Sequence, residues 1–523
     1  MTAGGFMFGD RRSAVAFWLG SAIVTVGVGL HMPMFLMARS MNYMLAGMPM
    51  DLGMYVGMAL IVLGIGAAGY GLLPKTLPSH AHGTLATIAP PEDAPLTAAH
   101  WMLMVVLAVA LIIDIMKPAS LGFVTPGMRM EYGVGGATVS LLPLSALVGT
   151  AVGSFVWGVL ADTYGRRASI LLSSVMFIGT SICGAMPSFW WNVFMCFLMG
   201  AAAGGVLPVA YALLAEIMPT KHRGWSLVLV GGIGAIGGYF AASGLSAILQ
   251  PTFGWRIMWF LNLPTGLILI CLSPLLPESA RFLQHVGRIS EARKVLARFG
   301  VVAVHSEEID EDAGGHAPLP PPGYIGTTTA LTLAALTWGL VNFGLLLWLP
   351  SELVAEGHSV GLSSGIIAKS TLIAAPTILI STYAYSRWST KWSLVTMVGI
   401  TALGLFGVLL RGMGTVPLLS NPVVSLVMLI IGSTGVISMI LPYAAEKYPI
   451  KVRGRATGWI AGCSKIGGLI AQGLSALAVV PAIGIAAAVI AVPAILTILL
   501  IAKFGRETKG RDLRELERAP ARA

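Results

Sequence analysis

The chain has 523 residues, of which 56% are hydrophobic and only 10% are charged. A soluble domain has roughly 25% charged residues, so this composition excludes that class and indicates a polytopic α-helical membrane protein. The formal charge of +10 is then explained by basic cytoplasmic loops rather than by nucleic-acid binding. The four cysteines lie in apolar runs without metal-ligand spacing, so we predict no disulfide framework, no metal and no cofactor.

Two apolar runs, near 14–38 and 52–73, are long enough to span a membrane. We interpret 1–75 as an N-terminal helix pair and the Pro- and His-rich stretch 76–100 as a cytoplasmic linker. The closely spaced glycines in 53–73 allow close helix contact, which leaves open whether the pair packs on the rest of the chain or forms oligomers.

Twelve further spans follow in two sets of six, separated by a polar segment. The first set makes a bundle over 101–285, with spans near 102–126, 138–160, 169–187, 190–215, 225–249 and 257–276. A central cytoplasmic loop over 286–325 begins with "SEARKVLARFG", which favours a short amphipathic helix. The second bundle covers 326–503, with spans near 327–350, 363–386, 393–411, 422–444, 456–480 and 483–503, and a charged cytoplasmic tail covers 504–523.

Basic residues gather in alternate connections along this chain. Cytoplasmic loops of membrane proteins are enriched in Lys and Arg. This asymmetry predicts two plus six plus six spans with both termini in the cytoplasm. We expect a multi-pass protein of the plasma membrane, in a bacterium the inner membrane, whose surroundings are the lipid bilayer.

A short motif occurs twice. "AEIMPTKHRG" (215–224) and "AEKYPIKVRG" (445–454) share the pattern E-x-x-P-x-x-x-R-G, and each follows the fourth span of its set. The repeat pairs Glu216 with Glu446 and Arg223 with Arg453. Two homologous bundles of this kind are typical of transporters that rock around a site at mid-membrane.

"GVLADTYGRR" (158–167) joins the second and third spans of the first bundle. It matches G-x-x-x-D-x-x-G-R-R, and here the chain resembles the major facilitator superfamily. The resemblance implies two pseudo-symmetric six-helix bundles, here with two extra N-terminal helices and about 14 spans in all. It also implies a cytoplasmic gate, whose candidate residues are Gly158, Asp162, Gly165, Arg166, Arg167, Glu216, Arg223, Glu446 and Arg453.

Two further motifs resemble those of sugar-porter-like members of that superfamily. "PESARFL" (277–283) follows the sixth bundle span, and "RETKGRDLREL" (506–516) lies in the tail. The second bundle carries only a degraded copy of the gate signature, "SRWSTKW" (386–392), in which Arg387 and Lys391 are expected to anchor the helix end.

Asp114 and Lys117 stand in the apolar run of the first bundle span, in "LIIDIMKPAS". Residues three apart share a helix face, and Asp114 lies about 13 residues into its span, roughly 20 Å at 1.5 Å per residue. An ionisable residue at that depth indicates a functional site. Aromatic-acid symporters, which the chain resembles, carry D-G-x-D in this span, and Lys117 stands where they place the second carboxylate. We therefore assign proton coupling to Asp114 and place Lys117 in the substrate cavity.

Lys465, in the fifth span of the second bundle, also lies near mid-depth, whereas Lys369 is closer to the external end. Two central lysines against one aspartate favour an anionic substrate. "NFGLLLWLPSEL" (342–353) resembles a region of metabolite:proton and organic-acid:proton symporters. The predicted cavity residues are Lys117, Asn342, Trp348, Lys369, Lys465 and Gln472.

These features predict a secondary active transporter that couples a small organic, anionic metabolite to protons by alternating access. Proton-driven efflux of drug-like compounds and a non-transporting sensor or scaffold on the same fold are the alternatives. The chain has no HExxH or P-loop signature, so we do not expect an enzyme. The predicted partners are a small-molecule substrate and protons, and the oligomeric state stays open.

Overall fold

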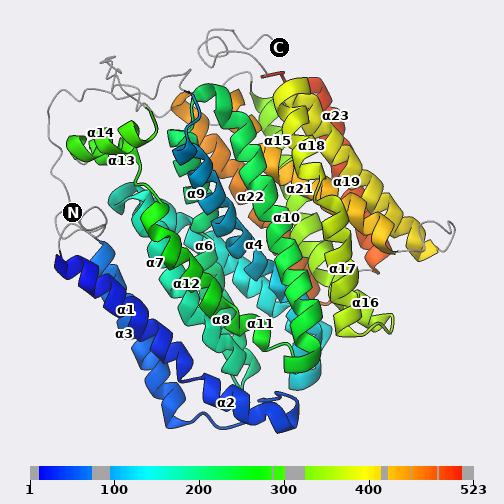
Figure 1. Ribbon diagram of the computed structural model, residues 1–523. Coiled ribbons are helices and arrows are strands. Elements are labelled where there is room, and N and C mark those ends of the chain that lie inside the picture. Colours follow the sequence, from blue (N-terminus) through cyan, green and yellow to red (C-terminus); the bar gives the residue numbers. More distant parts are fainter. Residues whose placement is uncertain are drawn as a thin grey trace. The chain divides into compact units, whose positions relative to one another are not determined.

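Long apolar helices make up the described part of the chain (Figure 1). The computed structural model describes residues 11–73, 95–285, 288–300, 324–413, 422–448, 450–479 and 482–508. Most of the predicted linker 76–100, much of the central loop 286–325 and most of the tail 504–523 lie outside these ranges, as do the side chains of Asp162 and Arg453.

Thirteen helical segments of the described residues are long and apolar enough to cross a membrane. A further helix, α22 (Ile450–Ala476), has 27 residues, and its lower hydropathy reflects its basic start and Lys465. The predicted all-α membrane fold with about 14 spans is confirmed.

The helices fall into the predicted order along the chain. The N-terminal pair comprises α1 (Arg11–Gly29), α2 (Met32–Met37), η2 (Ala38–Met41) and α3 (Leu52–Leu72). The first set comprises α4 (Ala98–Tyr132), α5 (Gly136–Val139), α6 (Leu141–Tyr164), α7 (Arg166–Gly179), η3 (Thr180–Ala185), α8 (Phe189–Ala203), α9 (Val206–Ile217), α10 (Thr220–Phe253), α11 (Ile257–Phe260), α12 (Asn262–Leu272) and η4 (Ser273–Leu275).

Two short helices come next, α13 (Ala280–His285) and α14 (Ile289–Arg298), and α14 is the amphipathic helix expected in "SEARKVLARFG". Its Leu296 packs against Ala280 of α13. The second set comprises α15 (Ile325–Leu340), η6 (Val341–Leu345), α16 (Leu346–Ala355), α17 (Val360–Ala374), α18 (Thr377–Tyr383), η7 (Ala384–Trp388), α19 (Thr390–Met413), α21 (Pro422–Lys447), α22 and α23 (Ile483–Phe504).

The glycines of the N-terminal pair form a seam between α1 and α3, which lie side by side in Figure 1. A Cβ atom at Gly20 would lie 2.6 Å from the carbonyl oxygen of Gly64, and one at Gly57 would lie 2.6 Å from that of Gly27. Only glycine allows backbones to approach this closely. The close contact expected in 53–73 is therefore made within the pair.

The N-terminal pair also packs on α7 of the first set. A Cβ at Gly179 would lie 2.9 Å from Cγ2 of Ile61, and one at Gly69 would lie 3.8 Å from Cδ1 of Leu172. Of the two alternatives for the pair, packing on the rest of the chain is therefore observed, while oligomer formation stays a prediction.

The contacts divide the chain into two compact units. Unit 1 comprises the described residues of Met1–Gly135, Ser145–Lys221 and Ile248–Glu308, and unit 2 those of Gly136–Leu144, His222–Ala247 and Ile309–Ala523. Helix α10 contributes to both. In unit 1, Gln250 Nε2 donates to the carbonyl of Phe123 over 3.1 Å, and in unit 2 the hydroxyls of Ser246 and Ser364 are 2.7 Å apart. The domain boundaries at 285 and 326 stay a prediction.

Candidate functional site

Helix α4 buries Asp114 and Lys117 of unit 1, with exposed fractions of 6% and 1%. The Lys117 ammonium lies over the ring of Phe177 on α7 and interacts electrostatically with the Asp114 carboxylate. Among the described residues, its Nζ atom has no hydrogen-bond partner. The net charge of this buried pair changes when Asp114 takes up a proton or when an anion binds near Lys117.

A proline follows this pair directly. Pro118 cannot donate the helical hydrogen bond that the carbonyl of Asp114, four residues earlier, would otherwise accept. The backbone of α4 is thus more polar at Asp114 than a regular helix would be, which suits a site for protons or polar ligands.

In unit 2 the predicted residues gather around the π-helical turn η6. Such turns are rare and are frequently found at functional sites. Gln472 Nε2 on α22 donates to the carbonyl of Phe343 in this turn. A Cβ at Gly468 would lie 2.8 Å from Phe343 Cβ, so α22 and the turn are in close contact.

Lys465 on α22 places its Nζ atom 4.8 Å from the centre of the Phe343 ring, so this predicted cavity lysine, like Lys117, lies near an aromatic ring. Trp348 follows one turn beyond η6, where a Cβ at Gly344 would lie 3.7 Å from its ring. Trp348 Nε1 and Gln472 Oε1 are buried and have no hydrogen-bond partner among the described residues. Unit 2 therefore offers one donor, one acceptor and one cation around Phe343.

The other two predicted cavity residues of unit 2 differ in their surroundings. Asn342 lies in η6 and is half-buried, beside Phe343. Lys369 on α17 is exposed, and no described contact joins it to the other predicted residues.

The gate signature of unit 1 forms a tight turn into α7. Gly165 has φ +106°, a conformation that favours glycine, and a Cβ there would collide with the carboxylate of Glu278. Glu278 Oε1 accepts hydrogen bonds from the backbone N–H groups of Arg166 (2.8 Å) and Arg167 (3.4 Å). Burial raises the pKa of the Glu278 carboxyl, and these N–H groups with the charge of Arg167 offset part of the rise.

Side chains extend this cap. Arg166 Nη2 lies 3.3 Å from Glu216 Oε1, Ser279 Oγ donates to Glu216 Oε2, and Arg167 Nη2 donates to the carbonyl of Ser273 over 2.7 Å. The motif residues of 158–167, 215–224 and 277–283 thus meet in one network.

Unit 2 contains an equivalent cap built from different residues. Glu507 Oε1 accepts from the backbone N–H of Thr390 over 2.9 Å, and Ser389 Oγ donates to Glu507 Oε2. Thr508 Oγ1 donates to Glu446 Oε2 over 2.7 Å, as Ser279 donates to Glu216. Glu507 and Thr508 therefore do in the second half what Glu278 and Ser279 do in the first.

Two further contacts complete the second cap. Lys391 Nζ donates to the carbonyl of Ala502 over 2.8 Å, which corresponds to Arg167 and Ser273 in unit 1. Tyr385 OH donates to Glu446 Oε2 over 3.0 Å, and Arg223 of α10 interacts electrostatically with Glu446.

The remaining gate prediction concerns Gly158. A Cβ there would meet no atom within 4 Å among the described residues, so no close contact is described at Gly158, and its part in the gate stays a prediction. The sequence analysis did not predict that Phe177 and Phe343 contact Lys117 and Lys465. It also did not predict that Glu278 and Glu507 cap the N-termini of α7 and α19. Both glutamates stood in motifs that had been recognised, which was the available signal.

A family model described as Major Facilitator Superfamily matches residues 103–472. The niacin transporter of Acinetobacter baylyi is 24% identical over 389 residues, 73% of this chain and 87% of the relative. The 4-hydroxybenzoate transporter of the same organism is 26% identical and covers 74% of this chain and 86% of its own length. The gentisate transporter of Corynebacterium glutamicum is 26% identical, covering 68% and 76%.

Among solved structures, the proton:xylose symporter XylE bound to a bromo-deoxyglucose matches with a TM-score of 0.64. That match covers 80% of this chain and 99% of the symporter at 17% identity, so it speaks for the fold alone.

Proposed function

The chain belongs to the Major Facilitator Superfamily of membrane transporters, and from that premise we propose that it is a proton-coupled symporter of a small aromatic or other organic carboxylate. The observation that carries this proposal is the buried pair of Asp114 and Lys117 on α4, with the Lys117 ammonium held over Phe177.

The likeness to relatives supports the substrate class. Niacin, 4-hydroxybenzoate and gentisate, which the relatives' names contain, are small aromatic carboxylates. A negatively charged ligand binds best beside a cation that is already buried. The free-energy cost of taking that cation out of water has then been offset when the protein folded, and is not added on binding. Lys117 meets this condition in unit 1, and Lys465 supplies a second cation in unit 2.

Coupling follows from the charge balance of the α4 pair. While Asp114 is ionised, its charge offsets that of Lys117, so a carboxylate substrate gains little by approaching. When Asp114 takes up a proton, the charge of Lys117 is left for the substrate. A proton and an anion therefore bind together and leave together, which makes the transport step electroneutral at one proton per monovalent carboxylate.

Unit 2, considered by itself, offers groups suited to an aromatic acid. Trp348 Nε1 can donate to a carboxylate or ring acceptor, and Gln472 Oε1 can accept from a ligand hydroxyl. The carbonyl of Phe343 accepts from Gln472, and its ring lies near the ammonium of Lys465. These groups support the proposal of an aromatic rather than an aliphatic acid.

Uptake of labelled benzoate and nicotinate into proteoliposomes tests the proposal. With an imposed inward proton gradient, the wild type is expected to accumulate at least one of the two acids. Asp114→Asn, which resembles the protonated carboxyl, is expected to abolish accumulation while keeping exchange of internal for external substrate. Lys117→Gln is expected to lose both.

Gradient-driven accumulation by Asp114→Asn would refute the assignment of proton coupling. Lys503→Gln is the matched control, because Lys503 is exposed at the end of α23 and is not among the predicted cavity residues. Export of unrelated cationic compounds by the same vesicles would favour drug efflux. Absence of flux for every acid tested, by protein that binds those acids, would favour a sensor.

A further inference from the structure

A buried ion pair lies at the end of unit 1 that the charge pattern predicts to be external. Arg256 Nη2 and Glu131 Oε1 are 2.6 Å apart, and their side chains are 0% and 4% exposed. Arg256 stands between α10 and α11, and Glu131 stands at the end of α4. A pair so deeply buried is stable only where further hydrogen bonds satisfy its remaining atoms.

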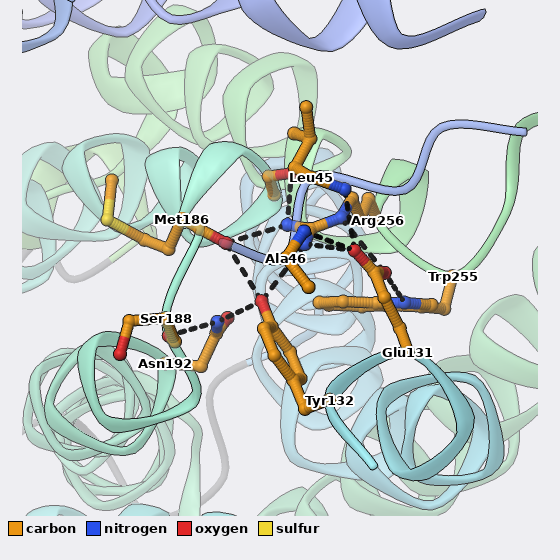
Figure 2. A network of polar contacts seen from close by, with 10 residues as sticks. Leu45, Ala46, Glu131, Tyr132, Met186, Ser188, Asn192, Trp255 and Arg256 are labelled. Atoms are coloured by element: carbon orange, nitrogen blue, oxygen red, sulfur yellow. Dashed lines mark hydrogen bonds and ion pairs between the residues drawn. The ribbon is translucent and has the colours of Figure 1, made fainter. Parts of the chain in front are cut away.

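The N-terminal pair of helices supplies two of these hydrogen bonds. In the loop before α3, the backbone N–H groups of Leu45 and Ala46 donate to Glu131 Oε1 over 2.6 and 2.9 Å, as Figure 2 shows. The next residue, Gly47, donates to the carbonyl of Pro187 over 3.1 Å. A loop of the N-terminal pair thus binds a carboxylate of the first six-span set through its backbone.

The rest of the network joins the end of α4 to helix α8 and to two connections of unit 1, the one before α8 and the one between α10 and α11 (Figure 2). Trp255 Nε1 donates to Glu131 Oε2 over 2.7 Å, and Arg256 Nη1 donates to the carbonyl of Met186 over 2.8 Å. Tyr132 OH donates to the same carbonyl over 2.8 Å and accepts from Asn192 over 2.9 Å. Without the loop, the carboxylate of Glu131 would keep its side-chain donors but lose both backbone donors.

Aromatic side chains and backbone conformation hold the loop in this place. The rings of Phe35 and Tyr43 stack with centres 4.8 Å apart, and Phe35 lies 4.9 Å from Phe260 of α11. Asn42 and Tyr43 have φ values of 53° and 59°; asparagine adopts this region comparatively readily, but for a tyrosine it is uncommon and costs free energy unless surrounding contacts stabilise it. The docked loop provides those contacts.

We infer that the N-terminal helix pair is a permanent part of unit 1, and that the Leu45 and Ala46 backbone amides are required ligands of the Glu131 carboxylate. The pair therefore fixes the end of α4, the helix that carries Asp114, and moves with unit 1 through the transport cycle. It is neither a detachable partner surface nor an independent anchor.

Hydrogen exchange on the full chain in nanodiscs tests this inference without any substrate. Amides in the peptide covering 41–48 are expected to exchange at least tenfold more slowly in the wild type than in Glu131→Ala. Glu356→Ala, which removes the partly exposed pair with Arg411 in unit 2, is the control and is expected to leave that peptide unchanged. Equal exchange in the wild type and Glu131→Ala would overturn the inference.

A milder pair of variants covers the case in which Glu131→Ala does not fold. Ala46→Pro removes one donor, whereas Ala46→Ser keeps it. Only the proline variant is expected to speed exchange in the peptides that contain Gly47 and Tyr132. The same exchange rates in both variants would contradict a role for the Ala46 amide.

A cross-link tests whether the pair moves. Ile61→Cys with Gly179→Cys, in a chain whose four cysteines are replaced by serine, joins α3 to α7 at a point of contact. Oxidised protein is expected to take up benzoate within twofold of reduced protein. A tenfold loss on oxidation that reductant restores would show that the pair moves against unit 1. Should benzoate not be a substrate at all, the exchange measurement alone decides.

Discussion

Two of the predicted cavity lysines have their ammonium groups near phenylalanine rings. Lys117 lies over Phe177, and Lys465 lies 4.8 Å from the centre of the Phe343 ring. An aromatic face attracts a cation without neutralising it. For Lys117, the remaining charge balance therefore depends on the protonation of Asp114, with which it interacts electrostatically. The positions of both lysines could be predicted because charges are conspicuous in an apolar helix, but Phe177 and Phe343 could not, since phenylalanines are ordinary there and the pairing depends on tertiary contact.

The turn before α7 requires a glycine at position 165. Its φ of +106° and the nearby carboxylate of Glu278 both disfavour a Cβ. Gly165→Ala is expected to lower the free energy of unfolding by about 1–3 kcal/mol. Gly158→Ala is the matched control, because its Cβ would meet open space inside a helix. Thermal unfolding in detergent compares the two, and equal melting temperatures would refute the strain argument.

The Glu278 carboxyl predicts a pH dependence. Burial raises its pKa, so the folded state binds the proton more tightly than the unfolded state does. The contribution to stability is therefore complete below the usual value of about 4.3 and is lost as the pH rises through the raised pKa. Glu278→Gln cannot ionise. Between a pH of about 4.3 and the raised pKa, the melting temperature of Glu278→Gln minus that of the wild type is therefore expected to increase. A difference that stays constant or decreases with pH would contradict a raised pKa.

At the scale of elements, the two halves use the same device to begin their third helices. A glutamate from beyond the sixth helix caps α7 in unit 1 and α19 in unit 2. The carboxylate satisfies backbone N–H groups that have no partner within the helix and favours the positive end of the helix dipole.

Glu507→Ala is expected to uncap α19 and to lower the free energy of unfolding by about 1–2 kcal/mol. The control, Glu291→Ala, removes an exposed pair with Arg288, for which the expected change is within about 1 kcal/mol. Chemical unfolding in mild detergent measures both. A Glu507 variant as stable as its control would show that the tail does not cap α19.

The elements themselves were largely predictable, because a run of about 20 apolar residues has few alternatives to a spanning helix. Gly165, Arg166 and Glu216 were also predicted to act together, because their motif brings its own geometry. The second cap could not be predicted, because Ser389 and Thr390 stand where the motif has glycine and arginine. Its carboxylate also binds a backbone N–H group, and every residue except proline has one, so the sequence does not show which is used. The docking of Leu45 and Ala46 was hidden for the same reason.

For the whole molecule, the distribution of Lys and Arg predicts the orientation in the membrane. Met44 lies in the loop before α3, which should be external, and Arg293 lies in α14, which should be cytoplasmic. In a Cys271→Ser background, Met44→Cys in intact cells is expected to react with a membrane-impermeant maleimide, and Arg293→Cys only after permeabilisation. The reverse pattern would invert the topology. Both native side chains are exposed, so access alone does not separate the two sites.

The carboxylate held by the N-terminal loop has a consequence for biogenesis. Glu131 follows its loop partner Leu45 by 86 residues, and Arg256 follows Glu131 by 125. At about 5–20 residues per second, the ribosome needs roughly 6–25 s to reach the arginine after making the glutamate. During that interval the helix pair is already inserted, yet its loop has no complete ion pair to bind. Slow translation between these codons would prolong the interval, and quality-control proteases would then meet a helix pair that is inserted but not locked.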